Sequence, residues 1–157
     1  MKITLVTVGT LKEDYLSAGV KEYAKRIGAY AKWEEVNLKE EKMAEETPAA
    51  IHAALEREGD KILAALPKDA YRIALCVEGK QYSSEELASL FGGIEDSPGK
   101  VALVIGSSWG LSERVKAACQ LRLSVSRMTF PHQLMRLILL EGIYRSLTIL
   151  AGKKYHK

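Results

Sequence analysis

Few side chains in this sequence have the types and spacing that chemistry requires. His52, His132 and His156 are too scattered for a metal-ligand set, and no cysteine pair accompanies them. The sequence contains neither of the nucleotide-binding loops GxxxxGK(S/T) and GxGxxG, and we expect no nucleophilic serine or cysteine. We therefore expect no metal site. We expect a reaction that depends mainly on positioning, such as attack on an already activated methyl donor.

A glycine-containing stretch, IGSSWGL, is a candidate binding loop. It follows an apolar run and precedes Ser112, which can cap a helix. Gly106 and Gly110 permit left-handed turns and a close approach of the main chain to a ligand. Many strand-to-helix turns carry two glycines for geometry alone, so the loop indicates a binding site without identifying its ligand.

A second candidate lies where Pro131 and His132 open a long apolar helix. A histidine with a reference pKa of about 6.5 suits proton transfer, but the same pair could serve only to begin the helix. Further along, Glu141 and Arg145 stand four residues apart, in the order that favours a helical ion pair. Structural and catalytic uses of this pair both remain open.

Apolar runs alternate with amphipathic runs and supply the elements that must position these residues. Strands are expected at residues 2–9, 31–38, 71–78, 100–105 and 121–126. Helices are expected at residues 13–27, 48–66, 83–93, 113–119 and 133–150. This alternation predicts an α/β domain with a mostly parallel sheet and helices on both faces.

Some elements carry more detailed expectations. Gly28 falls where a left-handed helix cap would lie. Residues 31–38 are only half apolar, which predicts a strand near a sheet edge, whereas the nearly continuous apolar run 71–78 predicts a strand covered on both faces.

The positions of three loops indicate where a ligand would bind. In parallel sheets, ligands collect outside the carboxyl ends of the strands. Residues 78–80, 106–110 and 127–132 follow expected strands. We therefore expect these three loops to form the binding site together.

The last helix is apolar nearly all the way round, and only Arg136, Glu141 and Arg145 interrupt it with charge. We expect one face to pack on the sheet and another on a second chain. Gly142 favours this interpretation, because a glycine in a helix interior costs about 1 kcal/mol and close approach of another backbone is one reason to tolerate it. A wholly buried helix in a monomer is the alternative.

Length and composition limit the number of domains, the location of the protein and the kind of partner it can have. The chain has 157 residues, of which 47% are hydrophobic and 27% charged, which predicts one globular domain over residues 1–157. No run is long and uncharged enough for a membrane span, and the first residues lack the features of a signal peptide. Cys76 and Cys119 indicate buried thiols in a reducing compartment, so we expect a cytoplasmic protein. The net charge of +3 permits a polyanionic partner without requiring one.

Several segments are similar to those of one known family. They are MKITLVTVGTLKEDYLSAGVKEYAKRI, LCVEGKQYSSEELA, VALVIGSSWGL and LSVSRMTFPHQLMRLILLEGIYRSLTILAGKKYHK. The last is the most specific, because TFPHQLMR, LLEGIYR and a terminal YHK occur in that order. On these segments the chain resembles, from end to end, the RlmH family of the SPOUT methyltransferases. The resemblance implies a parallel-sheet α/β knot with a deep C-terminal trefoil, which pattern alone would not suggest because knots are nearly absent from proteins.

The resemblance also implies an activity. Enzymes of this family use S-adenosylmethionine to methylate N3 of a pseudouridine in the 23S ribosomal RNA of assembled ribosomes, and they act as homodimers. The implied cofactor contacts are Leu75, Gly106, Val125, Ser126, Arg127, Met128, Thr129 and Phe130. The family usually has a second glycine at position 107, where this chain has Ser107. If that position requires a positive φ, the serine costs about 1 kcal/mol or more.

The remaining site residues carry less specific expectations. The catalytic candidates are His132, Arg136, Tyr155 and His156. The candidates for RNA phosphate contacts are Arg136, Arg145, Lys153, Lys154 and Lys157, because cations fix a nucleic acid through its backbone. Tyr155 and His156 could instead stack on or hydrogen-bond an unpaired base, and the short tail could complete the partner subunit's site. Two other functions stay open, namely a SPOUT methyltransferase of tRNA and a non-catalytic RNA-binding knot protein.

Overall fold

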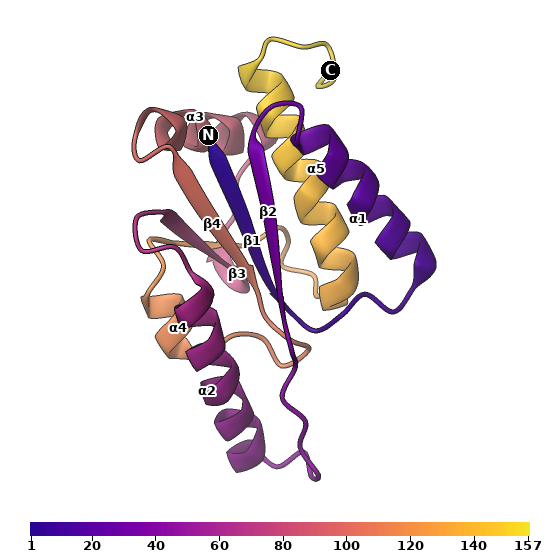
Figure 1. Ribbon diagram of the computed structural model, residues 1–157, viewed down its shortest axis with the longest axis vertical. Helices are drawn as coiled ribbons and strands as arrows, with labels where there is room; N and C mark the ends of the chain where they lie inside the picture. The colour runs from indigo at the N-terminus through magenta and orange to yellow at the C-terminus, as the bar shows by residue number, and fades with distance from the viewer.

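Two buried strands form the centre of the sheet in the computed structural model, which describes residues 1–157 (Figure 1). β1 (Lys2–Val8) and β4 (Lys100–Ile105) pair in parallel. β2 (Lys32–Leu38), β3 (Tyr71–Lys80) and β5 (Leu121–Leu123) complete an all-parallel sheet in the order β2-β1-β4-β3-β5. The half-apolar β2 lies at an edge, which confirms that prediction.

The two faces of the sheet carry separate cores. Ile3 and Leu5 of β1 point into one cluster, whereas Val6 and Val8 point into the other. The first core is covered by α1 (Asp14–Ile27), α3 (Ser84–Asp96) and α5 (His132–Leu150). The second is covered by α2 (Pro48–Ala65) and α4 (Glu113–Ala117), as Figure 1 shows. The predicted α/β class with helices on both faces is therefore confirmed.

Some helix boundaries differ from those expected. Gly28 is not a left-handed cap, because its φ of −58° continues the helical turn and its N–H bonds to the Ala24 carbonyl. α3 passes through Gly92 and Gly93 to Asp96, since Phe91 and Ile94 continue its buried face. α4 ends at Ala117, and the Ala118 N–H is shared among the carbonyls of Arg114, Val115 and Lys116, which tightens the turn.

The junction of β3 and β5 also corrects the sequence prediction. Residues 78–80 belong to β3 and do not form a loop. β5 passes directly over Gly79, where a Cβ would lie 2.6 Å from the Leu123 carbonyl carbon. Only the first half of β3 is covered on both faces, because the second half is largely exposed. β5 ends at Leu123 rather than at residue 126, because Ser124 Oγ donates to the Ser126 carbonyl at 2.9 Å and turns the chain.

α5 packs on the sheet and between α1 and α3 of its own chain. The contact with α1 is close, since a Cβ at Gly19 would lie 2.9 Å from Leu137 Cδ1. Gly142 makes no such approach, and a Cβ there would meet only Leu87 at 3.9 Å. The expected approach of a second chain at Gly142 thus stays a prediction. No helix combines the length and apolar character needed to cross a membrane.

Candidate functional site

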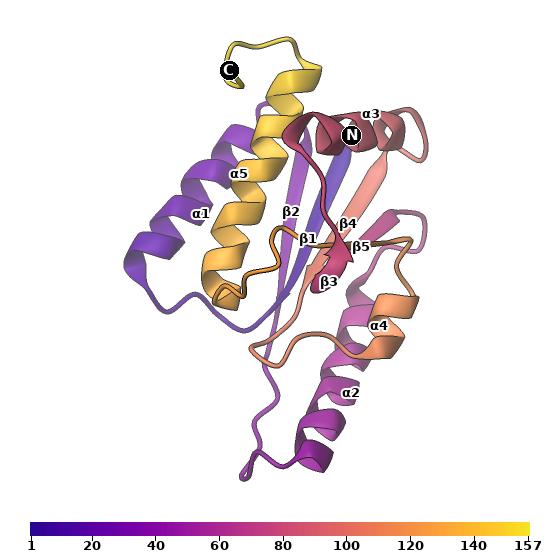
Figure 2. The same ribbon diagram turned by 180° about the vertical axis from the view of Figure 1, so that it is seen from behind.

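A cavity opens at the carboxyl ends of β3, β4 and β5, and its lining includes residues of α4 and of the start of α5. Figure 2 shows the ribbon of these strands and the chain that leads from β5 to α5. Its volume is about 580 Å³, which is typical of a small-molecule site. The walls come from the second half of β3, residues 105–111 and residues 123–132. Of the segments that the topology argument selected, residues 106–110 and most of residues 127–132 line the cavity, whereas only Glu78 of residues 78–80 does so. Seven of the eight expected cofactor contacts line this cavity: Leu75, Gly106, Val125, Ser126, Met128, Thr129 and Phe130. Arg127 does not line it and is exposed, so its placement departs from the expectation.

The glycine loop folds back on itself and needs both of its glycines. The Gly110 N–H donates to the Ser107 carbonyl at 2.9 Å, and Gly110 has a φ of +90°. A Cβ at Gly106 would lie 2.1 Å from the Gly110 carbonyl oxygen. The positive φ therefore excludes a side chain at Gly110, and lack of space excludes one at Gly106. Both exclusions are expected of a tight binding loop.

Ser107 is unstrained, contrary to the concern raised by the family pattern. No residue other than glycine has a positive φ in this structure. The Ser107 side chain is buried, and its Oγ donates to Glu58 Oε1 at 2.8 Å. The conformational cost expected at this position is thus not incurred.

Serine side chains shape the wall formed by residues 123–132. Ser126 Oγ accepts from the Met128 N–H at 3.0 Å, which shapes the turn after β5. Val125 and Met128 remain exposed, at 40% and 65%. Trp109 in the glycine loop and Val77 at the end of β3 are also exposed. Four large apolar side chains therefore surround the cavity, which is the kind of surface that a ligand or partner covers.

His132 lies at the cavity wall as the first residue of α5. Pro131 is the cap residue, and no side chain makes a capping hydrogen bond there. Burial lowers the pKa of His132, the Glu40 carboxylate opposes this by raising it, and the Arg136 and Lys12 charges lower it further. The imidazole is therefore neutral at neutral pH, the state in which one ring nitrogen can accept a proton.

Arg136 cannot act as proposed from the sequence. Its side chain is only 2% exposed. One terminal nitrogen donates to Asn37 Oδ1 and the other to the Gly9 carbonyl, both at 3.1 Å, and Glu35 lies 3.7 Å away. Direct contact with an RNA phosphate or a reacting group is incompatible with this burial. Arg136 instead fixes the start of α5 against the ends of β1 and β2.

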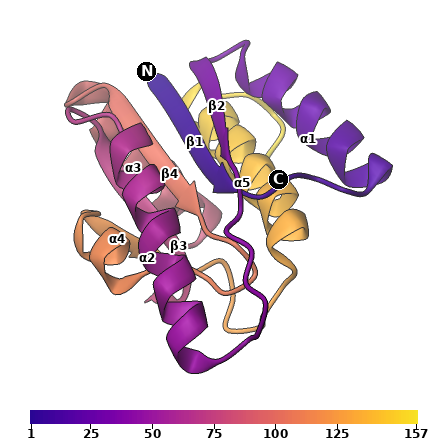
Figure 3. The same cartoon turned by 60° about the horizontal axis from the view of Figure 1, so that its bottom comes forward.

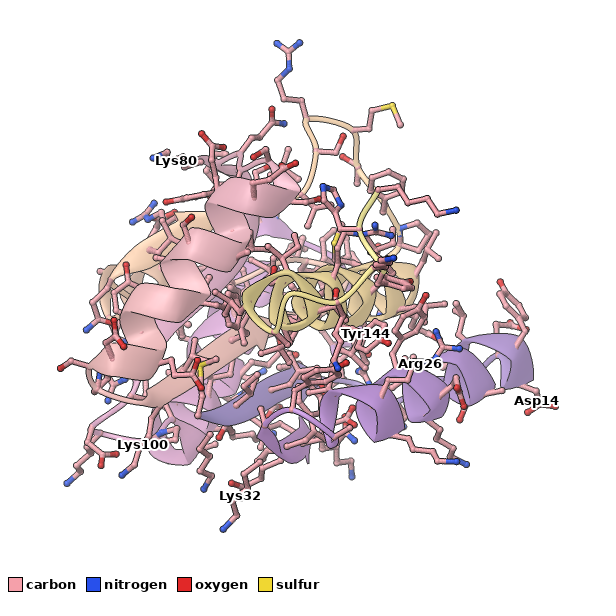
Figure 4. The ribbon with its side chains drawn as sticks, turned by 90° about the horizontal axis from the view of Figure 1, so that it is seen from above. Asp14, Arg26, Lys32, Lys80, Lys100 and Tyr144 are labelled. Atoms are coloured by element: carbon pink, nitrogen blue, oxygen red, sulfur yellow. The ribbon has the colours of Figure 1, made fainter.

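The C-terminal tail lies at the opposite end of α5. Tyr155 donates to Glu141 Oε1 at 3.1 Å, and the Arg145 guanidinium lies 4.7 Å from the Tyr155 ring centroid. Glu141 and Arg145 form an ion pair at 2.5 Å, so their structural use is observed. Hydrogen bonding to Tyr23, burial and Glu141 together raise the pKa of Tyr155 to about 12. The tail runs over the end of α5, close to the labelled Arg26 and Tyr144 (Figure 4).

Distance separates the tail from the cavity of the same subunit. His156 Nε2 lies 2.8 Å from Glu85 Oε1 on α3. α5 has 19 residues between the cavity and this tail, a length of about 28 Å. The structure therefore places His132 at the cavity, whereas Tyr155 and His156 cannot reach it within one subunit. Three of the proposed RNA contacts, Lys153, Lys154 and Lys157, are exposed on the tail.

One ion pair at the cavity was not foreseen. Lys116 on α4 and Glu78 on β3 both line the cavity and pair at 2.5 Å. They are 38 residues apart, so no local pattern joins them.

Cys76 and Cys119 are partly rather than fully buried, and burial raises the pKa of both thiols, that of Cys119 to about 11. No three His, Cys, Asp or Glu side chains converge as metal ligands would.

Comparison with known proteins identifies the family. A family described as "Predicted SPOUT methyltransferase" matches residues 1–156. Proteins named "Ribosomal RNA large subunit methyltransferase H" from Bacillus pumilus and Listeria monocytogenes are 46% and 47% identical, and each alignment covers all of both chains. A probable methyltransferase of known structure from Bordetella pertussis shares the fold, with a TM-score of 0.61 at 16% identity over 93% of this chain and 94% of that one. The chain therefore belongs to the SPOUT methyltransferase family, among the proteins known as ribosomal RNA large subunit methyltransferase H.

Proposed function

We propose that this protein transfers a methyl group from S-adenosylmethionine to N3 of a pseudouridine in the 23S RNA of the assembled ribosome. The observation that carries the proposal is the full-length identity of 46–47% with relatives named as methyltransferases of large-subunit ribosomal RNA. A single domain over residues 1–157, carrying the deep knot of the family, is part of the same proposal. We expect it to act in the cytoplasm, where its substrate is found.

The cavity fits the proposed donor in size and chemistry. S-adenosylmethionine combines a flat apolar base with a ribose and a charged amino-acid group. The cavity has 11 hydrophobic residues among the 22 that line it, together with the Lys116–Glu78 pair. Gly106 and Gly110 carry no side chain, so main chain lines part of this space. These features support a site in which main-chain groups hold the adenine.

The bound donor would supply a methyl group on a sulfonium, which is a good leaving group. The chain must then hold the acceptor nitrogen in line with that methyl group and remove one imide proton. His132 is the candidate proton acceptor, because it lies at the cavity and is neutral at neutral pH. The Arg136 contacts with Asn37 and Gly9 hold the helix that carries it.

A homodimer would give the catalytic candidates Tyr155 and His156 access to a cavity. Tyr155 and His156 lie too far from the cavity of their own subunit, so they can serve a reaction only in the site of a partner. Val77, Trp109, Val125 and Met128 leave apolar surface open around the cavity for a second chain. We propose that the partner's tail covers this surface, and that Arg145 with the three tail lysines contacts RNA phosphates.

Methylation of purified substrates tests the proposal. The protein is incubated with labelled S-adenosylmethionine and either ribosomes lacking the modification or bulk tRNA, and the product is mapped by mass spectrometry. We expect one methyl group on a pseudouridine of 23S RNA in ribosomes. Methylation of tRNA alone would establish the tRNA enzyme, and failure to take up the donor in calorimetry would establish the non-catalytic protein.

A further inference from the structure

A buried carboxylate behind the glycine loop has no part in the function described so far. Glu58 lies on α2 and is only 3% exposed. Burying a carboxylate is costly unless it is well hydrogen-bonded. Both of its oxygens have partners, and each partner belongs to a different loop. The position of Glu58 therefore needs an explanation that involves those two loops.

Each Glu58 oxygen accepts one hydrogen bond. Oε1 accepts from Ser107 Oγ at 2.8 Å, and Ser107 belongs to the glycine loop that lines the cavity. Oε2 accepts from the Glu41 N–H at 3.0 Å, in the segment that joins β2 to α2. One side chain thus links two loops that are far apart in sequence. Figure 3 shows α2 beside the chain that leaves β2.

The neighbours of Glu58 reinforce this link. Lys61 and Arg57, on the same helix, pair with Glu41 at 2.6 and 3.3 Å. Gly59 packs so closely that a Cβ there would lie 2.9 Å from Ser112 Oγ, at the far end of the glycine loop. α2 is therefore held in register with both loops, and Glu58 has little freedom to move.

The linked segment also carries charge toward His132. A Cβ at Gly9 would lie 3.6 Å from Glu40 Oε2 and 3.7 Å from His132 Nε2, so these two side chains flank Gly9. Glu40 precedes Glu41, whose N–H is held by Glu58. The charged groups that act on His132 are Glu40 and Glu58, which raise its pKa, and Arg136 and Lys12, which lower it.

We propose that Glu58 is a positioning residue of the methyl-donor site, which fixes the glycine loop through Ser107 and the segment of Glu40 and Glu41 through its main chain. This inference rests on the proposed function, because it concerns the cavity in which the donor would bind. It gives Ser107 a specific role, since a glycine at this position would leave Glu58 Oε1 without its donor. Charge-assisted hydrogen bonds of this kind are the strong ones in proteins.

Calorimetric binding of S-adenosylhomocysteine, the demethylated donor, tests the inference with the full-length protein. Glu58→Ala and Ser107→Ala should each raise the dissociation constant about tenfold, a change of about 1.4 kcal/mol. The double variant should bind no more than about threefold more weakly than Glu58→Ala, because both changes remove one shared interaction. Glu56→Ala is the matched control, since Glu56 lies on the same helix but pairs with exposed Arg114, and it should bind as the wild type does.

Glu58→Gln separates positioning from general stability. The amide can accept from the Glu41 N–H and donate to Ser107 Oγ, so binding should stay within about threefold of the wild type. Removing the negative charge should also lower the pKa of His132, which NMR titration of the imidazole measures. This charge effect arises whether or not Glu58 positions the loops, so positioning is measured by binding: a merely structural role would lower the melting temperature of Glu58→Ala and leave its dissociation constant for S-adenosylhomocysteine unchanged.

The outcomes distinguish this inference from the proposed function. If the wild-type protein does not bind S-adenosylhomocysteine, the proposed function fails. If the wild type binds and both Ser107→Ala and Glu58→Ala bind equally well, only the role of Glu58 is overturned. Should Glu58→Ala fail to fold, Ser107→Ala still decides. Wild-type binding of S-adenosylhomocysteine by Ser107→Ala overturns the inference.

Discussion

The tight turn of the glycine loop makes Gly106→Ala the sharpest test of the binding site. A Cβ at this position would lie 2.1 Å from the Gly110 carbonyl oxygen, 2.5 Å from the Gly110 carbonyl carbon and 3.0 Å from Leu111 Cδ2. Real Cβ atoms essentially never lie closer than 3.0 Å to another heavy atom. Two of these contacts are with main chain, which cannot rotate away as a side chain can. The loop must therefore open.

The size of the effect follows from this displacement. Opening the contact from 2.1 Å to an allowed distance moves the loop by about 1 Å, a misplacement that costs about 100-fold in a preorganised site. Overpacking of this kind costs about 1–3 kcal/mol, which corresponds to about 5–150-fold in a binding constant. We therefore expect the dissociation constant for S-adenosylhomocysteine to rise about 100-fold.

Gly93→Ala provides the matched control for this substitution. Gly93 lies inside α3, and a Cβ there would meet nothing within 4 Å. The alanine should stabilise the helix by about 0.5–1 kcal/mol and raise the melting temperature by about 1–4 °C, with ligand binding unchanged. Calorimetry and thermal unfolding measure both variants side by side. Wild-type affinity in a folded Gly106→Ala protein would refute the assignment of this loop to the donor.

Three further predictions concern the reaction and the dimer. The methylation rate should fall as the pH drops through the pKa of His132, which burial holds below its usual value of about 6.5. In His132→Asn the rate should be lower by about 100-fold or more and should no longer fall at acid pH in this way, whereas an unchanged pH–rate profile would exclude His132 as the proton acceptor. A chain truncated after Gly152 should lose methylation of ribosomes and keep donor binding within twofold, because the walls of the cavity contain no residue of the tail. Loss of binding as well would contradict the role given to the tail. If a second backbone packs at Gly142, Gly142→Ala should raise the dissociation constant of the dimer at least tenfold in sedimentation experiments. A more stable protein with an unchanged dissociation constant would favour a helix buried by its own chain.

The fold was predictable because its signals are local. The alternation of apolar and amphipathic runs predicted five strands, five helices and a sheet with helices on both faces. Ser112 caps the helix that its sequence position indicates. Gly28 ends α1 as expected, but without the expected left-handed conformation. The pair Gly92 and Gly93 does not end α3 as expected. Packing of Phe91 and Ile94 carries α3 past its two glycines, and no local rule contains that information.

The site was predictable to the extent that it is made of contiguous loops. Parallel strands place their carboxyl ends together, so the sequence could select the segments that surround the cavity. Long-range partners were out of reach, because Glu58 and Ser107 are 49 residues apart and Lys116 and Glu78 are 38 apart. The burial of Arg136 was missed for the same reason, since Asn37 and Gly9 lie about 100 positions or more from it in sequence.

A crystal structure of the protein with S-adenosylhomocysteine is the most direct measurement of whether this cavity holds the methyl donor. We predict the adenine against the main chain of residues 106–110 and 124–130, with the sulfur facing His132 and the tail of a second subunit over the opening. Ligand bound elsewhere, with these turns unoccupied at saturating concentration, would contradict the account.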